Sequence, residues 1–423
     1  MLIISCFNNI TLGLQFISPM SNQKHISETI ALRLNRIAES ETIAMAKLGR
    51  ALAAEGKPII NLSFGEPDFR TPDHIKQAAI DAINQNFTYY TPVAGIPDLK
   101  EAVKLKFKRD NNLEYNTDQI VVSTGAKNSI MNTVLALVNP GDEVIIPQPY
   151  WVSYSDMVNL AEGVCVFINT SIEDLYKITP QQLEEAITPK TKLFMFSSPN
   201  NPSGMIYNES ELKAFAEVFE RHPHVYILSD EIYEHINFNE KHYSIANYGT
   251  LINRTITVNG VSKAFSMTGW RIGYIGAPKE IAFACEKLQS QFTSGTNSIA
   301  QKAAIAALLG DMQPTYDMKK AFHSRRDLCY NLLKQTEGIK LLNPDGAFYL
   351  FPDISNFIGK SYKNYTINNS QDLCMYILNE FYVVTVAGSA FGNDNCIRLS
   401  FATNEENLTI AINRIKEALS LLK

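Results

Sequence analysis

The chain has 423 residues, of which 45% are hydrophobic and 19% are charged, and its formal net charge is -5 at pH 7. These values exclude a disordered or fibrous protein, and a chain of this length predicts two or more lobes around a sizeable buried interior. The sequence carries no basic block, which argues against a nucleic-acid partner. Its six cysteines form no CxxC pair and no zinc spacing, so we expect no disulfide framework, no metal site and a reducing, cytoplasmic environment.

The first 20 residues are fairly apolar but contain no Lys or Arg, and a polar run follows from Ser21 to Glu28. A secretory signal would need a basic start and a small-residue cleavage site. The segment is also too short and too polar to span a bilayer, so no membrane partner is expected. We interpret residues 1–28 as an N-terminal extension that is either disordered or the product of an upstream start, with Met20 as the natural first residue.

The next part of the chain predicts helices separated by turn-rich loops. Apolar residues recur at helical spacing from Ile26 to Glu55, and Ile59 to Leu62 is typical of a short strand. The loop from Ser63 to Pro72 is rich in turn formers, and helices are expected from Asp73 to Asn84 and from Asp98 to Arg109.

From residue 119 onward, short apolar strands alternate with amphipathic helices. The expected strands are 119–123, 143–147, 164–169, 192–197, 225–229, 255–258 and 271–276. The expected helices between them are 126–137, 152–161, 209–220 and 280–291. This alternation predicts an α/β domain with a mostly parallel sheet.

A different pattern begins at residue 313 and predicts a smaller α+β domain. A long charged helix is expected to Gln335, followed by strands at 347–351, 383–386 and 397–401 and a closing helix at 405–422. We expect residues 29–69 to join this small domain, residues 70–312 to form the large domain, and residues 313–423 to complete the small one.

The segment Gly260 to Tyr274, GVSKAFSMTGWRIGY, places Lys263 eight residues before Arg271 in an otherwise uncharged stretch. A desolvated lysine amine is a nucleophile toward carbonyls, and an arginine fork suits a phosphate. The pair is typical of pyridoxal phosphate held by a lysine. Most lysines of globular proteins are solvated surface residues, however, and from this pair alone that interpretation of Lys263 is the more common one.

Four further segments follow or occupy predicted strands, where α/β sheets place their ligands. Ser123 to Lys127 could be a phosphate seat or an ordinary turn, and Ser198 to Gly204 could present an amide or be a plain turn. Asp230 could hold a pyridine nitrogen protonated or cap a helix, and Tyr233 could reach a phenolic oxygen. Arg398 is either an edge residue or a buried fork for a carboxylate.

Several motifs recur together in the order expected of one family: SFGEPDF, YTPVAGIPDL, NPGDEVIIPQPYWVSY, SPNNPSG, SDEIYEHI, GVSKAFSMTGWRIG and IRLSFATNEENL. From about Leu32 to its end, the chain resembles the class-I, fold-type I pyridoxal-phosphate aminotransferases, and within them the bacterial one-gamma aspartate aminotransferases. The resemblance implies a large domain with a mostly parallel seven-stranded sheet flanked by helices, and a smaller α+β domain. One departure is AGSAFG at 387–392, where the family usually has Pro before the first Gly.

The resemblance also implies the cofactor, pyridoxal 5'-phosphate, and the residues that hold it. Lys263 would carry it as the internal aldimine and shuttle the proton, with Asp230 and Tyr233 as the other catalytic residues. The expected cofactor-binding residues are Gly125, Ala126, Trp151, Asn201, Asp230, Tyr233, Lys263, Arg271 and Tyr90. Tyr90 would reach the phosphate of the neighbouring subunit, which implies a homodimer with shared sites.

Substrate recognition is implied in the same way. Arg398 would bind the α-carboxylate, and the expected substrate-binding residues are Gly65, Lys127, Trp151, Asn201, Arg398, Ser40 and Thr42. The implied reaction is ping-pong transamination between aspartate and 2-oxoglutarate. Preference for prephenate, aromatic or other amino acids stays open, as does a lyase on the same fold, whereas a regulator fused to a DNA-binding module would need a basic segment that the sequence lacks.

Overall fold

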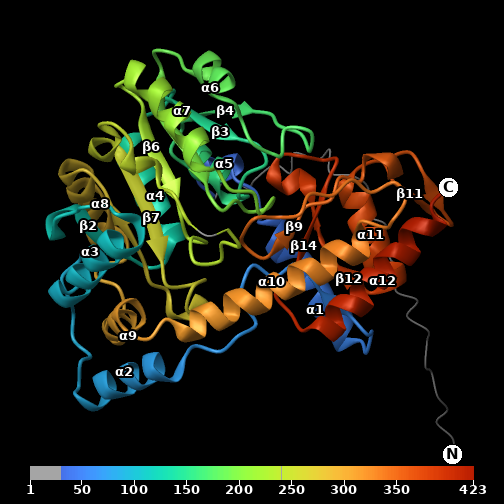
Figure 1. The fold of residues 1–423 in the computed structure, drawn as a ribbon, viewed down its shortest axis with the longest axis horizontal. Helices are drawn as coiled ribbons and strands as arrows, with labels where there is room; N and C mark the ends of the chain where they lie inside the picture. Colours follow the sequence, from blue (N-terminus) through green and yellow to red (C-terminus); the bar gives the residue numbers. More distant parts are fainter. Residues whose placement is uncertain (1–29, 240) are drawn as a thin grey trace, which may run out of the picture.

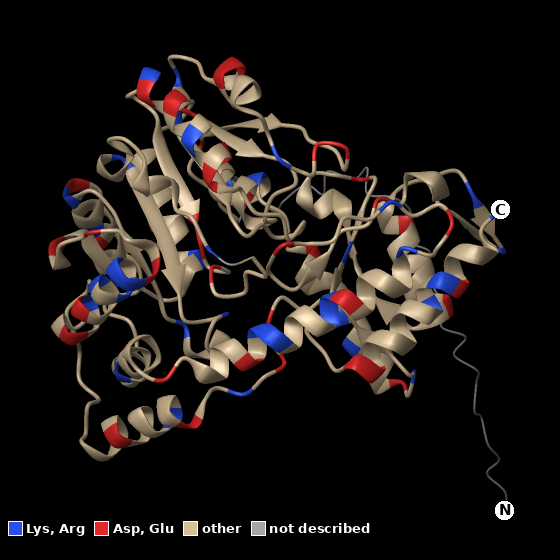
Figure 2. Ribbon diagram, viewed as in Figure 1, with Lys and Arg blue, Asp and Glu red and all other residues tan. Residues whose placement is uncertain are grey.

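The structure is a computed structural model that describes residues 30–239 and 241–423. The expectations for residues 1–28, including the start at Met20, lie outside these ranges. Within them, every helix is too short or too polar to cross a membrane. Acidic and basic residues are interspersed over the helices of both lobes, in line with the mild net charge (Figure 2).

The larger lobe is built on a seven-stranded sheet with the strand order β2-β8-β7-β6-β5-β3-β4 (Figure 1). The strands are β2 (Ile120–Ser123), β3 (Glu143–Pro147), β4 (Val164–Ile168), β5 (Thr191–Ser197), β6 (Tyr226–Asp230), β7 (Thr255–Gly260) and β8 (Gly273–Gly276). Only β8 among them runs antiparallel to its neighbours, β2 and β7. The predicted α/β class and the mostly parallel seven-stranded sheet are therefore confirmed.

Helices cover both faces of this sheet because its strands bury side chains on both sides. Along β5, Leu193 packs into the core under α4 (Ala126–Leu137), α5 (Ser153–Leu160) and α8 (Lys279–Phe292). The next residue, Phe194, packs into the opposite core with α6 (Pro180–Ala186) and α7 (Glu209–Arg221). The helices α2 (Asp73–Asn84), α3 (Pro97–Asn111) and α9 (Ser298–Leu309) enclose a further core at the β2 side.

The smaller lobe combines segments from both ends of the chain. Its elements are α1 (Glu41–Ala54), β1 (Ile60–Asn61), β9 (Tyr349–Leu350), β10 (Ser361–Tyr362), β11 (Tyr365–Thr366), α11 (Ser370–Phe381), β12 (Val383–Val384), β13 (Val386–Ala387), β14 (Ile397–Ser400) and α12 (Glu405–Leu421). The strand β1 pairs with β12 in parallel, and β14 lies between β13 and β9, with Arg398 opposite Val386 and Leu399 opposite Leu350. The long helix α10 (Gln313–Leu333) extends beside both lobes (Figure 1). The domain boundaries expected from the sequence stay a prediction.

The prediction of one continuous helix from Ile26 to Glu55 is wrong, because the described residues of this range form two separate helices. Leu32–Arg36 forms a short 3-10 helix, the backbone is extended at Ile37, and α1 begins only at Glu41. Arg36 pairs with Glu162 beyond α5 at 2.8 Å, and the chain then leads through Ser40 to the cavity described below.

Other differences are local. The strand expected from Arg271 begins at Gly273, because Arg271 adopts the left-handed conformation with φ 58°. The expected strand 383–386 is split into β12 and β13, which pair with different partners. The sequence interpretation omitted α9, whose alanine-rich sequence has little helical amphipathicity, and also α6, α11 and the β10–β11 hairpin.

Candidate active site

A cavity of about 380 Å³ lies where strands of the large sheet end and the small lobe meets them. Its volume is in the range of small-molecule sites. It brings together most of the predicted site residues: Ser40, Thr42, Gly65, Ala126, Lys127, Trp151, Asn201, Asp230, Tyr233, Lys263, Arg271 and Arg398. Gly125 adjoins it at the start of α4, whereas Tyr90 lies outside it and is 99% exposed in the single chain.

Lys263 lies in the tight turn that follows β7. Its Nζ donates to the carbonyl oxygen of Gly65 and lies 5.8 Å from the centre of the Tyr233 ring. Burial lowers the pKa of Lys263 to about 8, and the positive charges of Arg398 and Arg271 act in the same direction, although Glu66 opposes them. At pH 7 about a tenth of the Lys263 amine is therefore neutral and nucleophilic, against less than about 0.1% of an ordinary lysine.

This pKa predicts selective labelling of Lys263 in the cofactor-free protein. At pH 8 about half of the Lys263 amine is neutral, whereas less than about 1% of an ordinary lysine is. We expect cyanate or acetic anhydride at limiting concentration to modify Lys263 before the other lysines, with a rate that rises with pH and reaches half its maximum near pH 8. Peptide mapping by mass spectrometry measures this rate, and a midpoint near pH 10 would contradict the assignment.

Asp230 ends β6 and is buried at the base of the cavity. Its Oδ2 accepts a 2.8 Å hydrogen bond from the Tyr154 hydroxyl, and its Oδ1 accepts one of 3.3 Å from the amide of Ile232. Burial raises the pKa of Asp230 to about 6, although both hydrogen bonds favour the ionised form. A buried carboxylate of this kind is stabilised by a cationic partner such as a protonated ring nitrogen.

The sequence interpretation missed Tyr154 and Tyr349. Tyr154 lies three residues after Trp151 in PYWVSY, so that helical spacing could have indicated a second inward-facing aromatic residue. Tyr349 on β9 is bound to Tyr233 through their hydroxyls at 2.8 Å. No local sequence signal links Tyr349 to the site, because the contact depends on how the two lobes pack.

An anion seat lies at the start of α4. The N-cap residue Gly125 has φ 85° and provides no side-chain cap, so amides of the first turn remain available to a ligand. A Cβ atom at Gly125 would lie 2.2 Å from Nη2 of Arg271, which shows how closely the guanidinium approaches the loop. Arg271 is fixed there by donating to the carbonyl oxygens of Thr268 at 2.8 Å and Thr124 at 3.3 Å. A glycine loop, a helix N-terminus and an arginine together suit a phosphate.

Arg398 reaches the cavity from β14 and is 2% exposed. It donates to Oδ1 of Asn201 at 2.9 Å and to the carbonyl oxygen of Ser63 at 2.7 Å. The Tyr349 and Phe391 rings contact its guanidinium at 4.5 Å and 4.8 Å from their centres. Its Nε has no hydrogen-bond partner among the described residues, and the two bonds above use only two of the five guanidinium N–H groups, so donors remain for a carboxylate. Burial lowers the pKa of Arg398, which nevertheless stays charged at neutral pH.

The backbone carbonyl groups of Ser63 and Gly65 contact two different side chains of the site. Gly65 lines the cavity, where its carbonyl oxygen accepts from Lys263, and its role in substrate binding stays a prediction. The carbonyl oxygen next to Arg398 belongs to Ser63, two residues earlier.

A second cation, Lys127, lies in the same cavity on the first turn of α4. Its Nζ is 4.9 Å from the centre of the Trp151 ring. Burial lowers the pKa of Lys127, and the nearby Arg271 acts in the same direction. Ser40 and Thr42 line the cavity beside it, at the start of α1. The cavity therefore presents Arg398, Lys127 and two hydroxyls to a ligand.

Comparison with known proteins identifies the family. Residues 57–415 match the family model described as aminotransferase class I and II. The chain belongs to this family. Its members are fold-type I enzymes that depend on pyridoxal phosphate.

Individual relatives and solved structures agree with this assignment. The aminotransferase is 49% identical to an aspartate/prephenate aminotransferase of Nitrosomonas europaea over 92% of the chain and 100% of the relative. It is 45% identical to a bifunctional aspartate aminotransferase and glutamate/aspartate-prephenate aminotransferase of Petunia hybrida, over 97% of the chain and 87% of the relative. The crystal structure of the Rhizobium meliloti aspartate aminotransferase superposes with a TM-score of 0.90 at 44% identity, covering 93% and 99% of the two chains.

Proposed function

We propose that this aminotransferase exchanges amino groups between aspartate and 2-oxoglutarate in a ping-pong reaction. The proposal rests on one observation above the rest, that Arg398 and Lys127 line the same cavity. A dicarboxylic substrate needs one cation for the α-carboxylate and one for the side chain. Relatives named for aspartate, at 44–49% identity, support the same substrate class.

The residues of the cavity fit pyridoxal phosphate. The amide-rich start of α4 at Gly125 and Ala126, with Arg271, would hold the phosphate, and Asp230 would pair with the ring nitrogen. Tyr233 and Asn201 would bond the phenolic oxygen, and Trp151 would cover the ring. The bound cofactor supplies an electron sink that stabilises negative charge at the substrate Cα.

The chain's own groups then perform the proton transfer. Lys263, in its neutral form, would take the proton from the substrate Cα with its Nζ and would then deliver it, as the general acid, to the cofactor carbon next to the substrate nitrogen. Asp230, held by Tyr154, would stay ionised beside the ring nitrogen and so maintain the electron demand of the ring. Arg398 orients the α-carboxylate through its fork and carries out no proton transfer.

A substrate panel tests this proposal. The purified enzyme, loaded with pyridoxal phosphate, is given single amino acids, and the cofactor absorbance and the oxo acid product are measured. Release of oxaloacetate from aspartate supports the proposal, and no absorbance change with any acidic amino acid refutes it. Prephenate is assayed as an amino acceptor beside 2-oxoglutarate, because relatives are named for both reactions.

Lys127→Ala should weaken dicarboxylic substrates selectively. We expect kcat/KM for aspartate to fall roughly 10- to 100-fold, since a charged hydrogen bond to the side-chain carboxylate is lost. The kcat/KM for alanine and phenylalanine should change less than about 3-fold, because neither has that carboxylate. Lys127→Met, which keeps an apolar contact with Trp151, should match Lys127→Ala. An equal loss for all substrates would show that Lys127 does not select the side chain.

We also propose a homodimer in which Tyr90 completes the partner's phosphate site. Tyr89 and Tyr90 are 83% and 99% exposed in the single chain, although large aromatic residues are usually buried on at least one side. We expect Tyr90→Phe to raise the Kd for pyridoxal phosphate roughly 10-fold, by loss of one hydrogen bond to a charged group. Equilibrium dialysis measures the Kd and sedimentation measures the mass. A monomeric wild-type enzyme would refute the homodimer, and a wild-type Kd for pyridoxal phosphate in Tyr90→Phe would refute the role of Tyr90.

A further inference from the structure

The chain contacts two different parts of the protein from the end of β6 onward. Asp230 and Tyr233 line the cavity, whereas the carboxylates of Glu231 and Glu234 are bound by residues of the protein interior, with side chains only 1% and 3% exposed. The turn after Asp230 is compact, because the amide of Glu234 donates to the carbonyl oxygen of Glu231 at 3.0 Å and the amide of Ile236 to that of Tyr233 at 2.8 Å. A shift of either glutamate would therefore displace this turn, which contains Tyr233 and directly follows Asp230.

Asn111, the last residue of α3, connects the two glutamates. Its Nδ2 donates to Oε2 of Glu234 at 2.6 Å and to Oε2 of Glu231 at 3.2 Å. Its Oδ1 accepts a 2.6 Å hydrogen bond from Lys106, whose ammonium group is 1% exposed and also pairs with Glu234. The C-terminal part of α3 therefore binds both carboxylates, through Asn111 to Glu231 and Glu234 and through Lys106 to Glu234.

Glu231 has a second set of partners on its other side. His242 Nε2 lies 2.9 Å from its Oε2, and the hydroxyls of Ser229 and Ser244 donate to its Oε1 at 2.9 Å and 2.6 Å. Burial alone would lower the pKa of His242, but the negative charge of Glu231 outweighs burial and raises this pKa above its ordinary value. Burial alone would raise the pKa of Glu234. The positive charge of Lys106 opposes this effect and holds the pKa of Glu234 well below its ordinary value. We call Lys106, Asn111, Glu231, Glu234 and His242 the carboxylate network.

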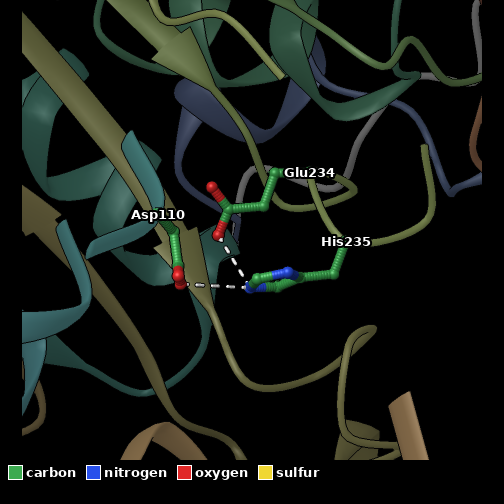
Figure 3. A group of neighbouring side chains, drawn as sticks. All are labelled: Asp110, Glu234 and His235. Atoms are coloured by element: carbon green, nitrogen blue, oxygen red, sulfur yellow. Dashed lines mark ion pairs between the residues drawn. The ribbon is translucent and has the colours of Figure 1, made fainter. Parts of the chain in front are cut away.

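Further charged residues border the carboxylate network at Glu234. Figure 3 shows His235 with its Nε2 between Glu234 and Asp110, at 3.2 Å and 3.5 Å from their carboxylate oxygens. Asp110 also accepts two hydrogen bonds from Arg109, at 2.6 Å and 2.9 Å. Lys106 and Arg109 therefore supply the positive charge that these carboxylates require, so the arrangement suits internal ion pairing better than a bound divalent cation.

We propose that the carboxylate network positions the active site by fixing the turn that carries Tyr233 and directly follows Asp230. None of its five residues lines the cavity, so they act through the turn, as positioning residues. The inference rests on the proposed roles of Asp230 and Tyr233, but not on which amino acid is the substrate. Charge-assisted, fully buried bonds restrict the turn more strongly than apolar packing would.

Asn111→Leu tests the proposal, since leucine has a similar volume and neither donates to the glutamates nor accepts from Lys106. With whichever amino acid is turned over, we expect kcat to fall roughly 10-fold with KM changed less than about 2-fold, because misplaced catalytic groups lower the rate more than substrate binding. We also expect the Kd for pyridoxal phosphate, measured by absorbance titration of the cofactor-free protein, to rise roughly 10-fold as Asp230 and Tyr233 lose their fixed positions.

Arg254→Met is the matched control. Arg254 is a buried cation of the same lobe that donates to the carbonyl oxygens of His222, Val225 and Phe219. The Arg254→Met variant should have a lower melting temperature, while its kcat per bound cofactor and its Kd for the cofactor stay at the wild-type values. If Asn111→Leu behaves in the same way as Arg254→Met, the network is merely structural and the proposal is wrong.

A second variant covers the case in which Asn111→Leu does not fold. The double variant Lys106→Met with Glu234→Gln removes both charges of one ion pair and leaves no uncompensated buried charge. The same lower kcat and weaker cofactor binding support the proposal, and wild-type values in the folded double variant overturn it. Failure of the aspartate assignment would instead appear as turnover of another substrate, with both network effects retained.

Discussion

Lys263→Ala is expected to lower kcat roughly 10⁴-fold or more, because a single side chain supplies both the nucleophilic amine and the proton transfer. The low pKa of Lys263, about 8, and its position beside Tyr233 leave no other described lysine to replace it, since Lys127 lies on α4 against Trp151. The variant should also lose the absorbance band of lysine-bound pyridoxal phosphate. Steady-state kinetics and an absorbance spectrum measure the two effects.

Lys213→Ala provides the control for this experiment. Lys213 lies on α7 with its side chain 57% exposed, and its salt bridge among the described residues is with Glu209 at 2.9 Å, so its loss should leave kcat within about 2-fold of wild type. Full activity of Lys263→Ala would exclude the catalytic assignment.

Arg398→Ala is expected to lower kcat/KM roughly 10²- to 10³-fold for every amino acid and oxo acid. The reason is that the α-carboxylate, common to all substrates, loses a desolvated charged partner. The effect should be uniform across side chains, unlike that of Lys127→Ala. Kinetics with aspartate, alanine and phenylalanine measure it, and a loss confined to aspartate would show that Arg398 binds the side chain instead.

Arg398→Lys separates charge from geometry. A lysine keeps the positive charge but cannot make the planar two-point contact, and it cannot bond Asn201 and Ser63 together as Arg398 does. We expect it to recover less than about a tenth of the lost kcat/KM. Recovery to wild-type values would mean that charge alone is sufficient.

Much of the large lobe follows from local sequence patterns. The strands of the central sheet are short runs of apolar residues, as in Val144 to Ile146, and burial on both faces makes such runs easy to distinguish from amphipathic helices. The ends of these strands converge at one edge of the sheet, which is why Asp230, Lys263 and the start of α4 could be expected to meet. Their individual roles came from the family resemblance and stay predictions.

Several of the features that were missed depend on packing between distant segments. The Tyr233–Tyr349 hydrogen bond joins residues 116 positions apart, and the Arg398–Ser63 bond joins residues 335 apart. No periodicity within a short window carries this information.

The pairing of β14 has a consequence for changes in chain length. Side chains alternate along a strand, so that Arg398 faces the cavity while Ile397 and Leu399 enter the core of the small lobe. An insertion within β14 would shift the following residues by one position, present an aliphatic side chain to the substrate carboxylate and place a guanidinium in the core. Evolution of this enzyme should therefore preserve the length of β14 as strictly as Arg398 itself.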